Sequence, residues 1–367
     1  VFTVFGGPHP TYSPEFIRSA GVDAICRGEG ESAFVAFLDA FNAKDDFLST
    51  PNFVFETEDG IVTNGISHLI EDLDSLAFPD REFFYSCPPL RASHLKSFIA
   101  SRGCPYKCTY CFNHVHNALY EGLGPVVRRR SVRNVIEEVA KVKQDYGVGM
   151  AQFMDDTFIL SAKWLEEFSE EFPRGAGVDF FCNVRAELVN RDTVRDLVRA
   201  GCKSVCLGIE TGDTKLRREI LERTQTDEQI IAACRLLKTS GIKVMTTNML
   251  GIPGGNLESD IATLKLNIAG KVDYAWTSLT YPYPGTRIHE IAKSKGFDIP
   301  EADSLTHSYF NGMPFESPQK NEIENLHRLL AIAAGAGIPH GLLLFLIRRK
   351  SSLARTFYTL AFGFWKL

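Results

Sequence analysis

Short apolar runs alternate with amphipathic segments between residues 96 and 290. The amphipathic segments have the 3.6-residue period of helices that cross from one strand to the next. Six such strand–helix units in a row predict a partial barrel, in which functional residues gather at the carboxyl ends of the strands. The apolar runs have the length and composition of buried parallel strands and lie at 97–101, 151–155, 178–183, 204–209, 243–250 and 274–281.

Polar residues mark where several of the intervening helices begin. Ser131 and Asn190 are each placed to cap a helix, and Thr226 and Gln229 have the spacing of a capping box. We therefore predict helices that start directly after residues 131, 190 and 226.

The chain follows other patterns on both sides of this region. Residues 1–44 read as two strand–turn–helix repeats, the alternation of an α/β unit. Residues 45–95 are rich in proline, have little helical periodicity and contain a predicted hairpin at Glu58-Asp59-Gly60, so we interpret them as a linker. Residues 291–367 are predicted to be helical, with one helix at 320–337 and an apolar, basic tail at 340–367.

Composition narrows the classes of protein that remain. The chain has 367 residues, a formal charge of -5 and basic residues that are dispersed except at Arg128–Arg130, which does not indicate nucleic-acid binding. An odd count of nine cysteines favours a reducing cytoplasm over a secreted disulfide framework. The apolar stretch 341–347 is too short to cross a bilayer. The sequence opens within an apolar run and without Met, so we expect the true N-terminus to lie upstream.

Three of the cysteines lie in a loop that follows the first predicted barrel strand. Cys104, Cys108 and Cys111 are four and three residues apart. Thiolates select iron–sulfur clusters, zinc or copper(I), and three thiolates leave one iron of a four-iron cluster open. Zinc is the alternative, with His114 or His116 as the fourth ligand.

The spacing Cys104-x3-Cys108-x2-Cys111, followed by Phe112, resembles the signature of the radical S-adenosylmethionine (SAM) superfamily. This resemblance implies a [4Fe–4S] cluster whose open iron is chelated by the amino and carboxylate groups of SAM. It further implies that an electron from the reduced cluster splits SAM into methionine and a 5′-deoxyadenosyl radical. A reductant such as ferredoxin or flavodoxin would supply that electron.

The ends of the next three predicted strands carry polar residues to which the resemblance gives roles. Asp155 and Asp156 are expected near the SAM amino group, although Asp156 can equally start the next helix. Asn183 and Arg185 are expected near the SAM carboxylate or the substrate, since a guanidinium binds a carboxylate through two parallel hydrogen bonds. Glu210 is expected near the SAM ribose and methionine, and a carboxylate at the end of an apolar strand requires a partner.

The fifth strand runs into a glycine-rich turn. Gly251, Pro253 and Gly254 resemble the turn through which the superfamily brings backbone close to adenine, and we take them, with Phe112, as further cofactor-binding candidates. The turn Tyr281–Thr286 is similar to one that closes many such barrels.

The N-terminal segment resembles the last third of a cobalamin-binding domain. Gly6 and Gly7, and later Gly28, match the positions where backbone passes beside the nucleotide tail of cobalamin. The Asp-x-His-x-x-Gly motif of that domain is absent from this sequence, so we expect only a partial cobalamin site here and a complete one in the full-length protein. We interpret His9 as a structural turn residue rather than a cobalt ligand.

The predicted fold class is therefore α/β. A partial (β/α)6 TIM-like barrel (96–290) follows a partial Rossmann-like cobalamin-binding domain (1–44) and a linker (45–95), and precedes a helical region (291–367). The resemblance implies cobalamin-dependent methyl transfer to an unactivated carbon or phosphorus of a small-molecule or lipid-like substrate. Radical cyclisation is the alternative within the same superfamily, and a non-catalytic iron–sulfur or zinc module is the alternative from another class. The tail is expected either to pack on the barrel or to contact a membrane surface.

Overall fold

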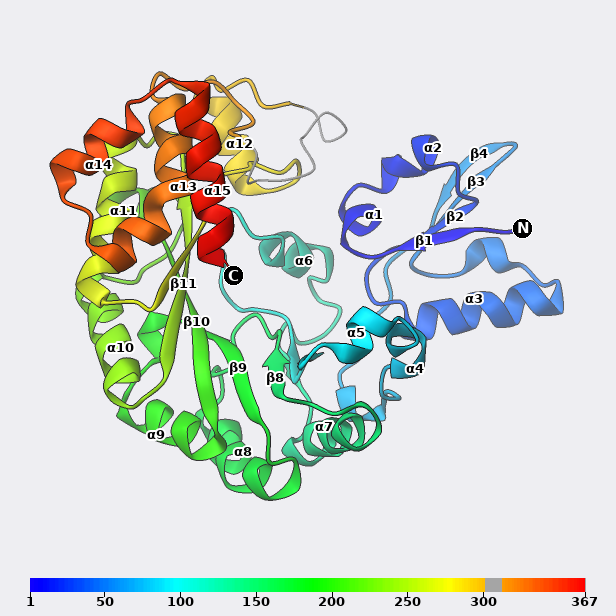
Figure 1. Cartoon of the computed structure of the whole chain (residues 1–367). Helices are drawn as coiled ribbons and strands as arrows, with labels where there is room; N and C mark the ends of the chain where they lie inside the picture. The colour runs from blue at the N-terminus through cyan, green and yellow to red at the C-terminus, as the bar shows by residue number, and fades with distance from the viewer. Residues whose placement is uncertain (301–311, 367) are drawn as a thin grey trace.

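The computed structural model describes residues 1–300 and 312–366, and its largest element is a parallel sheet of six strands. The strands lie in the order β12-β11-β10-β9-β8-β5, so strands that are consecutive along the barrel sequence are also neighbours in space. The sheet curves but leaves β5 and β12 as its two edges (Figure 1). All six predicted strands are confirmed, with bounds Leu95–Phe98 (β5), Met150–Phe153 (β8), Asp179–Val184 (β9), Cys202–Glu210 (β10), Lys243–Leu250 (β11) and Tyr274–Leu279 (β12).

A helix follows each of these strands; the first five cover the outer face of the sheet, and the sixth lies at its upper end in Figure 1, where the Ile288 amide donates to the Thr109 carbonyl oxygen at 3.0 Å. The predicted caps are confirmed: Ser131 Oγ accepts a hydrogen bond from the Asn134 amide at 3.1 Å, and Thr226 and Gln229 form a capping box. A cluster of fully buried aromatic rings, which includes Phe153, fills the layer between sheet and helices. The helices are Val132–Tyr146 (α7), Ala162–Gly175 (α8), Arg191–Ala200 (α9), Asp227–Thr239 (α10), Leu257–Gly270 (α11) and Arg287–Ser294 (α12).

The N-terminal unit is a second, smaller sheet of four strands. β1 and β2 are parallel, whereas β3 and β4 form an antiparallel hairpin that extends the sheet from β2. The hairpin was expected within a linker. It joins this sheet because Phe53 of β3 stacks on Phe37 of α3, with ring centroids 4.7 Å apart. A boundary at residue 44 would therefore divide one sheet. The elements are Val4–Gly6 (β1), Pro8–Tyr12 (α1), Ile17–Ala20 (α2), Ala24–Cys26 (β2), Glu31–Ala43 (α3), Phe53–Thr57 (β3) and Gly60–Thr63 (β4).

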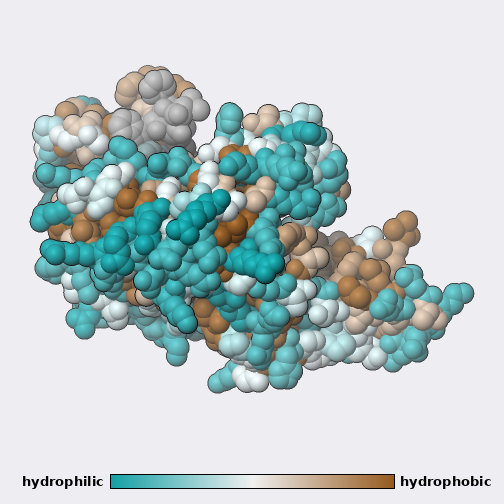
Figure 2. All heavy atoms as spheres, turned by 90° about the horizontal axis from the view of Figure 1, so that it is seen from below, coloured by the Kyte–Doolittle hydropathy of each residue, from teal (hydrophilic) through white to brown (hydrophobic). Residues whose placement is uncertain are grey.

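The outer face of α3 is apolar. Phe34, Val35 and Leu38 are each more than one-third exposed on this helix. Seen from below, apolar side chains gather on this end of the molecule (Figure 2).

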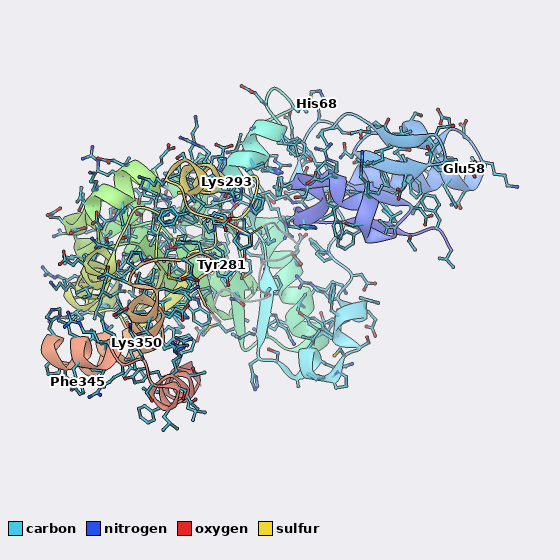
Figure 3. The ribbon with its side chains drawn as sticks, turned by 90° about the horizontal axis from the view of Figure 1, so that it is seen from above. Glu58, His68, Tyr281, Lys293, Phe345 and Lys350 are labelled. Atoms are coloured by element: carbon cyan, nitrogen blue, oxygen red, sulfur yellow. The ribbon has the colours of Figure 1, made fainter. Side chains whose placement is uncertain are left out.

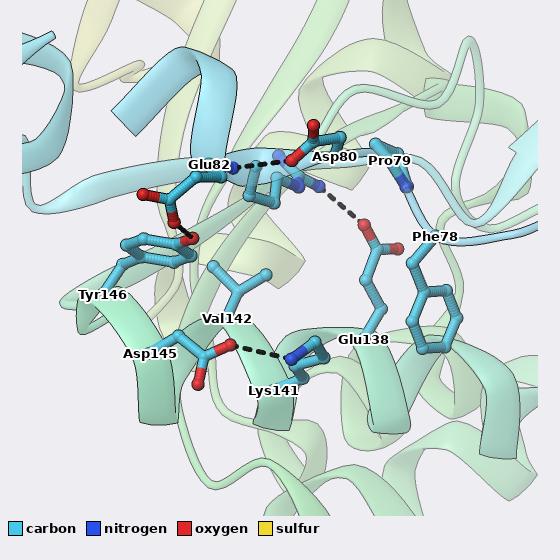
Figure 4. A pocket seen from close by; sticks show the side chains of 10 residues that line it. Phe78, Pro79, Asp80, Glu82, Glu138, Lys141, Val142, Asp145 and Tyr146 are labelled. Carbon is cyan, nitrogen blue, oxygen red and sulfur yellow. Dashed lines mark hydrogen bonds and ion pairs between the residues drawn. The ribbon is translucent and has the colours of Figure 1, made fainter. Parts of the chain in front are cut away.

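The segment between the two sheets packs on α7. It contains the short helices Arg81–Tyr85 (α4) and Pro88–Ala92 (α5). Arg81 forms an ion pair of 2.6 Å with the buried Glu138, and Tyr146 donates a hydrogen bond of 2.8 Å to Glu82. These contacts surround a cavity of about 280 Å³ (Figure 4). The segment predicted as a linker is thus fastened to the barrel.

The C-terminal region is helical, as predicted, over Lys320–Ala336 (α13), His340–Ile347 (α14) and Ser352–Lys366 (α15). α13 packs against β12 and α11, and Leu343, Ile347 and Tyr358 of the tail are buried in the same cluster. Phe345 and Lys350 lie at the opposite end of the molecule from Glu58 (Figure 3). Among the described residues, no helix is both long and apolar enough to cross a membrane. Residues 301–311 and the side chains of 364–367, including Phe364 and Trp365, lie outside the described part.

Candidate functional site

A cavity of about 260 Å³ opens at the carboxyl ends of the barrel strands, beside the cysteine loop. Seven of the candidate residues from the sequence line this cavity. Three come from the cysteine loop, and four lie at or just after the ends of β8, β9 and β10. These seven are Cys104, Cys108, Cys111, Asp156, Asn183, Arg185 and Glu210. The remaining wall consists of Tyr110, Asn113, Thr157, Val184, Cys206, Gly208, Arg223 and Thr247.

The cysteine loop is anchored at both ends. Before it, β6 (Ser101–Arg102) pairs with β7 (Arg128–Arg129). Gly103 has a φ of +86°, and a Cβ there would lie 1.9 Å from the Val126 carbonyl oxygen, so only glycine fits this approach. After the loop, α6 (Asn113–Leu119) begins directly and lies between the two units (Figure 1).

Hydrogen-bond donors surround two of the three sulfurs. Cys108 Sγ lies 3.6 Å from Arg185 Nη1 and 3.7 Å from Arg223 Nη1. Cys111 Sγ accepts from the backbone and side-chain nitrogens of Asn113 at 3.5 and 3.4 Å. Burial raises the pKa of Cys104, and it raises that of Cys111 to about 11. A ligand thiol must lose its proton, and donors aimed at sulfur favour the thiolate.

The sulfurs do not form a site for a single metal ion. In the described ranges, no three His, Cys, Asp or Glu side chains are grouped as such a site requires. His114 Nε2 is 3.3 Å from the Thr109 carbonyl oxygen, and His116 Nδ1 is 3.2 Å from the Tyr12 hydroxyl. Neither histidine lines the cavity, so the geometry disfavours a Cys3His zinc site.

Glu210 is turned into the cavity by an irregularity in β10. The register with β11 shifts between Gly208 and Glu210, and Glu210 has a φ of +65°, a strained value for a residue with a side chain. A Cβ on Gly208 would lie 2.5 Å from Glu210 Oε1, so glycine makes room for the carboxylate. Strain of this kind costs about 1–3 kcal/mol and clusters at functional sites.

The Glu210 carboxylate has partners but no close ion pair. Thr247 Oγ1 donates to Glu210 Oε1 at 3.1 Å, and Arg223 Nη1 is 3.9 Å away. Burial raises the pKa of Glu210, and Arg223 opposes that shift. Burial also raises the pKa of Tyr110, whose hydroxyl accepts from Arg223 Nη1 at 3.0 Å. The result is a buried, charged wall that a ligand with ammonium and carboxylate groups could match.

Adjacent aspartates at the end of β8 have different positions. Asp155 is buried beneath the cavity, where its carboxylate accepts from the Ala100 amide at 3.0 Å and from Ser101 Oγ. Burial raises its pKa. Asp156 is exposed on the cavity wall and accepts from Asn113 Nδ2 at 2.9 Å. Of the two, Asp156 is thus the one placed to contact a ligand.

Arg185 and Asn183 lie on the wall but are held by neighbours. The Arg185 guanidinium is 3.5 Å above the ring centre of Tyr106 and pairs with Glu187 at 2.6 Å. Asn183 Nδ2 donates to the Asp155 carbonyl oxygen at 2.9 Å.

The remaining candidates do not reach this cavity. Phe112 points toward the N-terminal unit and stacks on Tyr12, with ring centroids 4.8 Å apart. Gly251, Pro253 and Gly254 do not line it, and the Gly251 amide donates to the buried carboxylate of Asp260 at 3.1 and 3.2 Å.

A second cavity, of about 400 Å³, collects the three glycines of the N-terminal unit. Gly6, Gly7 and Gly28 line it together with Val4, Cys26, Gly30, Glu31 and Phe34. His9 is not on this wall and packs edge-on against Phe16, with ring centroids 4.6 Å apart, which favours its structural interpretation.

Known proteins resemble this chain in sequence. Residues 98–266 match the model of the radical SAM superfamily. An uncharacterized methyltransferase of Pyrococcus horikoshii is 29% identical over 80% of this chain and 63% of its own length. The anaerobic magnesium-protoporphyrin IX monomethyl ester cyclase of Cereibacter sphaeroides is 27% identical over 78% of this chain and 48% of its own length. The chain thus spans between about half and two thirds of these curated relatives.

Solved structures share the fold. The radical SAM methyltransferase TsrM of Kitasatospora setae, with cobalamin and a [4Fe–4S] cluster bound, is 19% identical with a TM-score of 0.67, over 85% of this chain and 64% of that one. OxsB, a cobalamin-dependent SAM radical enzyme with aqua-cobalamin and SAM bound, is 14% identical with a TM-score of 0.69, over 98% of this chain and 58% of that one. The predicted fold class is confirmed by these matches and by the six-stranded sheet. The cysteine loop and strands β8 to β11 all lie within the residues that match the radical SAM superfamily model, so this part of the chain resembles that superfamily.

Proposed function

We propose that this protein holds a [4Fe–4S] cluster on Cys104, Cys108 and Cys111 and uses it to cleave SAM reductively. The observation that carries the proposal is that three thiols of one loop share a single cavity wall with two guanidinium groups and two carboxylates. When bound, the cluster would supply the electron for SAM cleavage, and an external reductant such as ferredoxin or flavodoxin would replenish it.

The residues of the cavity have separate tasks in this proposal. Arg185 and Arg223 stabilise the thiolate of Cys108 through their hydrogen bonds to its sulfur. Asp156 and Glu210, which line the cavity, would accept hydrogen bonds from the ammonium and hydroxyl groups of SAM. Asp155 acts indirectly, because it holds Ala100 and Ser101 at the base of the cysteine loop.

For the overall reaction we propose cobalamin-dependent methyl transfer to a small-molecule or lipid-like substrate. Two observations support it: the glycine cavity of the N-terminal unit, and the resemblance to proteins named as methyltransferases, among them the cytidylyl-2-hydroxyethylphosphonate methyltransferase of Streptomyces wedmorensis. Cyclisation is the second candidate, favoured by the resemblance to the ester cyclase.

All nine cysteines are free, which supports a cytoplasmic location.

The first test is SAM cleavage after anaerobic reconstitution with iron and sulfide. With dithionite and SAM, the protein should form 5′-deoxyadenosine. Cys108→Ala should remove the cluster absorbance and the cleavage. Cys206→Ala is the matched control, because Cys206 lines the same cavity outside the loop, and it should keep the cluster. A fully loaded wild-type cluster without SAM cleavage would contradict the proposal.

The second test separates the two reactions. The protein is given cobalamin, SAM labelled in its methyl group and candidate substrates. Label in the product supports methyl transfer, whereas a substrate that is oxidised and ring-closed without label supports cyclisation.

A further inference from the structure

The ring of Phe112, which directly follows Cys111, is held from the N-terminal unit. It stacks on Tyr12 with ring centroids 4.8 Å apart and planes 16° apart. Tyr283, in the turn beyond β12, is a more distant neighbour at 6.4 Å and 45°. The closest aromatic support of the cysteine loop therefore comes from a residue 99 positions earlier than Cys111 in the sequence.

Tyr12 is itself fixed on two sides. Its hydroxyl lies 3.2 Å from His116 Nδ1, on α6. Its neighbour Thr11 donates to the Gly7 carbonyl oxygen at 2.7 Å and accepts from the Gly28 amide at 2.9 Å. The Tyr12 ring is thus part of an ordered interface between α1 and α6.

Asn113, the residue directly after Phe112, lines the cluster cavity. Asn113 donates to Cys111 Sγ from both of its nitrogens and to Asp156 Oδ1 at 2.9 Å. A shift of the Phe112 ring would move the backbone of Asn113, and with it the hydrogen bonds to a cluster sulfur and to a cavity carboxylate.

We propose that Tyr12 is a positioning residue of the SAM site. By holding Phe112 it keeps Asn113, Cys111 and Asp156 in the arrangement that binds SAM. The N-terminal unit then contributes to SAM affinity, although none of its residues lines the cluster cavity in the described structure. This inference rests on the proposed function, because it requires SAM to be a ligand.

The expected size follows from the strength of aromatic contacts. Stacked pairs contribute beyond their area burial by an amount that corresponds to about 2- to 10-fold in a binding constant. Tyr12→Leu should therefore raise the Kd for SAM about 2- to 10-fold, at unchanged iron and sulfide content. Tyr12→Phe keeps the ring and should stay within about twofold of wild type.

The experiment measures SAM binding to the anaerobically reconstituted, unreduced chain by calorimetry, so that no turnover is needed. Phe16→Leu is the matched control, since Phe16 packs on Phe5 and His9 in the same unit without touching Phe112. It should bind SAM as wild type does. The EPR signal of the reduced cluster, recorded with and without SAM, gives a second readout: the change caused by SAM should be weaker in Tyr12→Leu.

Each result of these measurements either supports or overturns the positioning role of Tyr12. An unchanged Kd in Tyr12→Leu, an equal loss in Phe16→Leu, or a parallel loss of iron overturns the positioning role. If circular dichroism shows Tyr12→Leu to be unfolded, Tyr12→Met, which better preserves side-chain length, takes its place under the same criteria. Failure of the wild-type protein with a full cluster to bind SAM would instead remove the proposed function, and the inference with it.

Discussion

The substitution Glu29→Gln tests how strongly the two units are joined. The Glu29 carboxylate pairs with Arg128 at 2.8 Å and Arg102 at 2.9 Å, and it accepts from the Ile70 amide at 3.0 Å. The side chain of Arg128 is only 2% exposed and that of Glu29 11%. Removing one charge of a buried pair leaves the other uncompensated and costs about 3–5 kcal/mol. We expect Glu29→Gln to lower the free energy of unfolding by this amount.

Glu31→Gln is the matched control for this prediction. Glu31 also pairs with Arg102, at 2.5 Å, but its side chain is 38% exposed and that of Arg102 is 33% exposed. An ion pair of this kind contributes about 0–1 kcal/mol. Urea unfolding followed by far-UV circular dichroism compares the two variants. Losses that agree to within about 1 kcal/mol would refute the reasoning, because burial would then not distinguish the two pairs.

The pH dependence gives an independent check. Burial acts to raise the pKa of Glu29, but hydrogen bonds from Ile70, Arg102 and Arg128 outweigh it and hold the pKa below its ordinary value of 4.5. A lowered pKa contributes stability above the ordinary value, and this contribution is lost as the pH falls through the lower, folded-state value. The difference in the free energy of unfolding between wild type and Glu29→Gln should therefore be largest at pH 7 and shrink below about pH 4.5.

Two other substitutions test single contacts. Gly28 has a φ of +70°, and a Cβ there would lie 1.9 Å from the Tyr120 hydroxyl oxygen, so Gly28→Ala should cost about 1–3 kcal/mol in thermal unfolding. Adding Tyr120→Phe should recover part of that loss, and a neutral Gly28→Ala would contradict the geometry. Burial raises the pKa of Asp260 to about 8, against the hydrogen bond from Gly251, so folding disfavours its charged form and stability should fall as the pH rises from 3.8 toward 8. Asp260→Asn should remove this dependence of the free energy of unfolding on pH. If the free energy of unfolding falls equally in both proteins between pH 5 and pH 8, Asp260 is not the source of the dependence.

Local pattern predicted the barrel because short strand-like runs alternate regularly with amphipathic helical segments. Within β8, β9 and β12 the buried residues alternate with half-buried or exposed ones, so one face of each strand packs in the core. The hairpin Phe53–Thr63 was harder to place. Its turn at Glu58-Asp59-Gly60 was visible, but its pairing with β2 depends on contacts with Phe37 that no local pattern encodes. The proline-rich composition of this segment favoured a linker, but tertiary packing makes the hairpin part of the N-terminal sheet.

Apart from the cysteine loop, which its spacing identifies, the site was predictable where it directly follows strand ends and not where it comes from farther along a connection or from within a strand. Arg223, which contacts Cys108 and approaches Glu210, lies in the crossover between β10 and α10 and carries no motif. Thr247 lies within β11 between Thr246 and Asn248, and only the structure shows which of these polar residues faces the cavity. Asp155 and Asp156 are adjacent in sequence, and the direction in which the chain leaves β8 decides which carboxylate reaches the cavity.

The contacts of Glu29 also bear on how the protein can be shortened. A piece that started at residue 96 would contain all six strands of the large sheet except the first residue of β5, and every residue of the cluster cavity. Without Tyr12, one face of the Phe112 ring would be exposed to solvent, and without Glu29 the Arg128 guanidinium would lose its carboxylate partner. We therefore expect that the boundary separating the two sheets in sequence does not separate independent folding units, and that the barrel excised alone expresses poorly and aggregates.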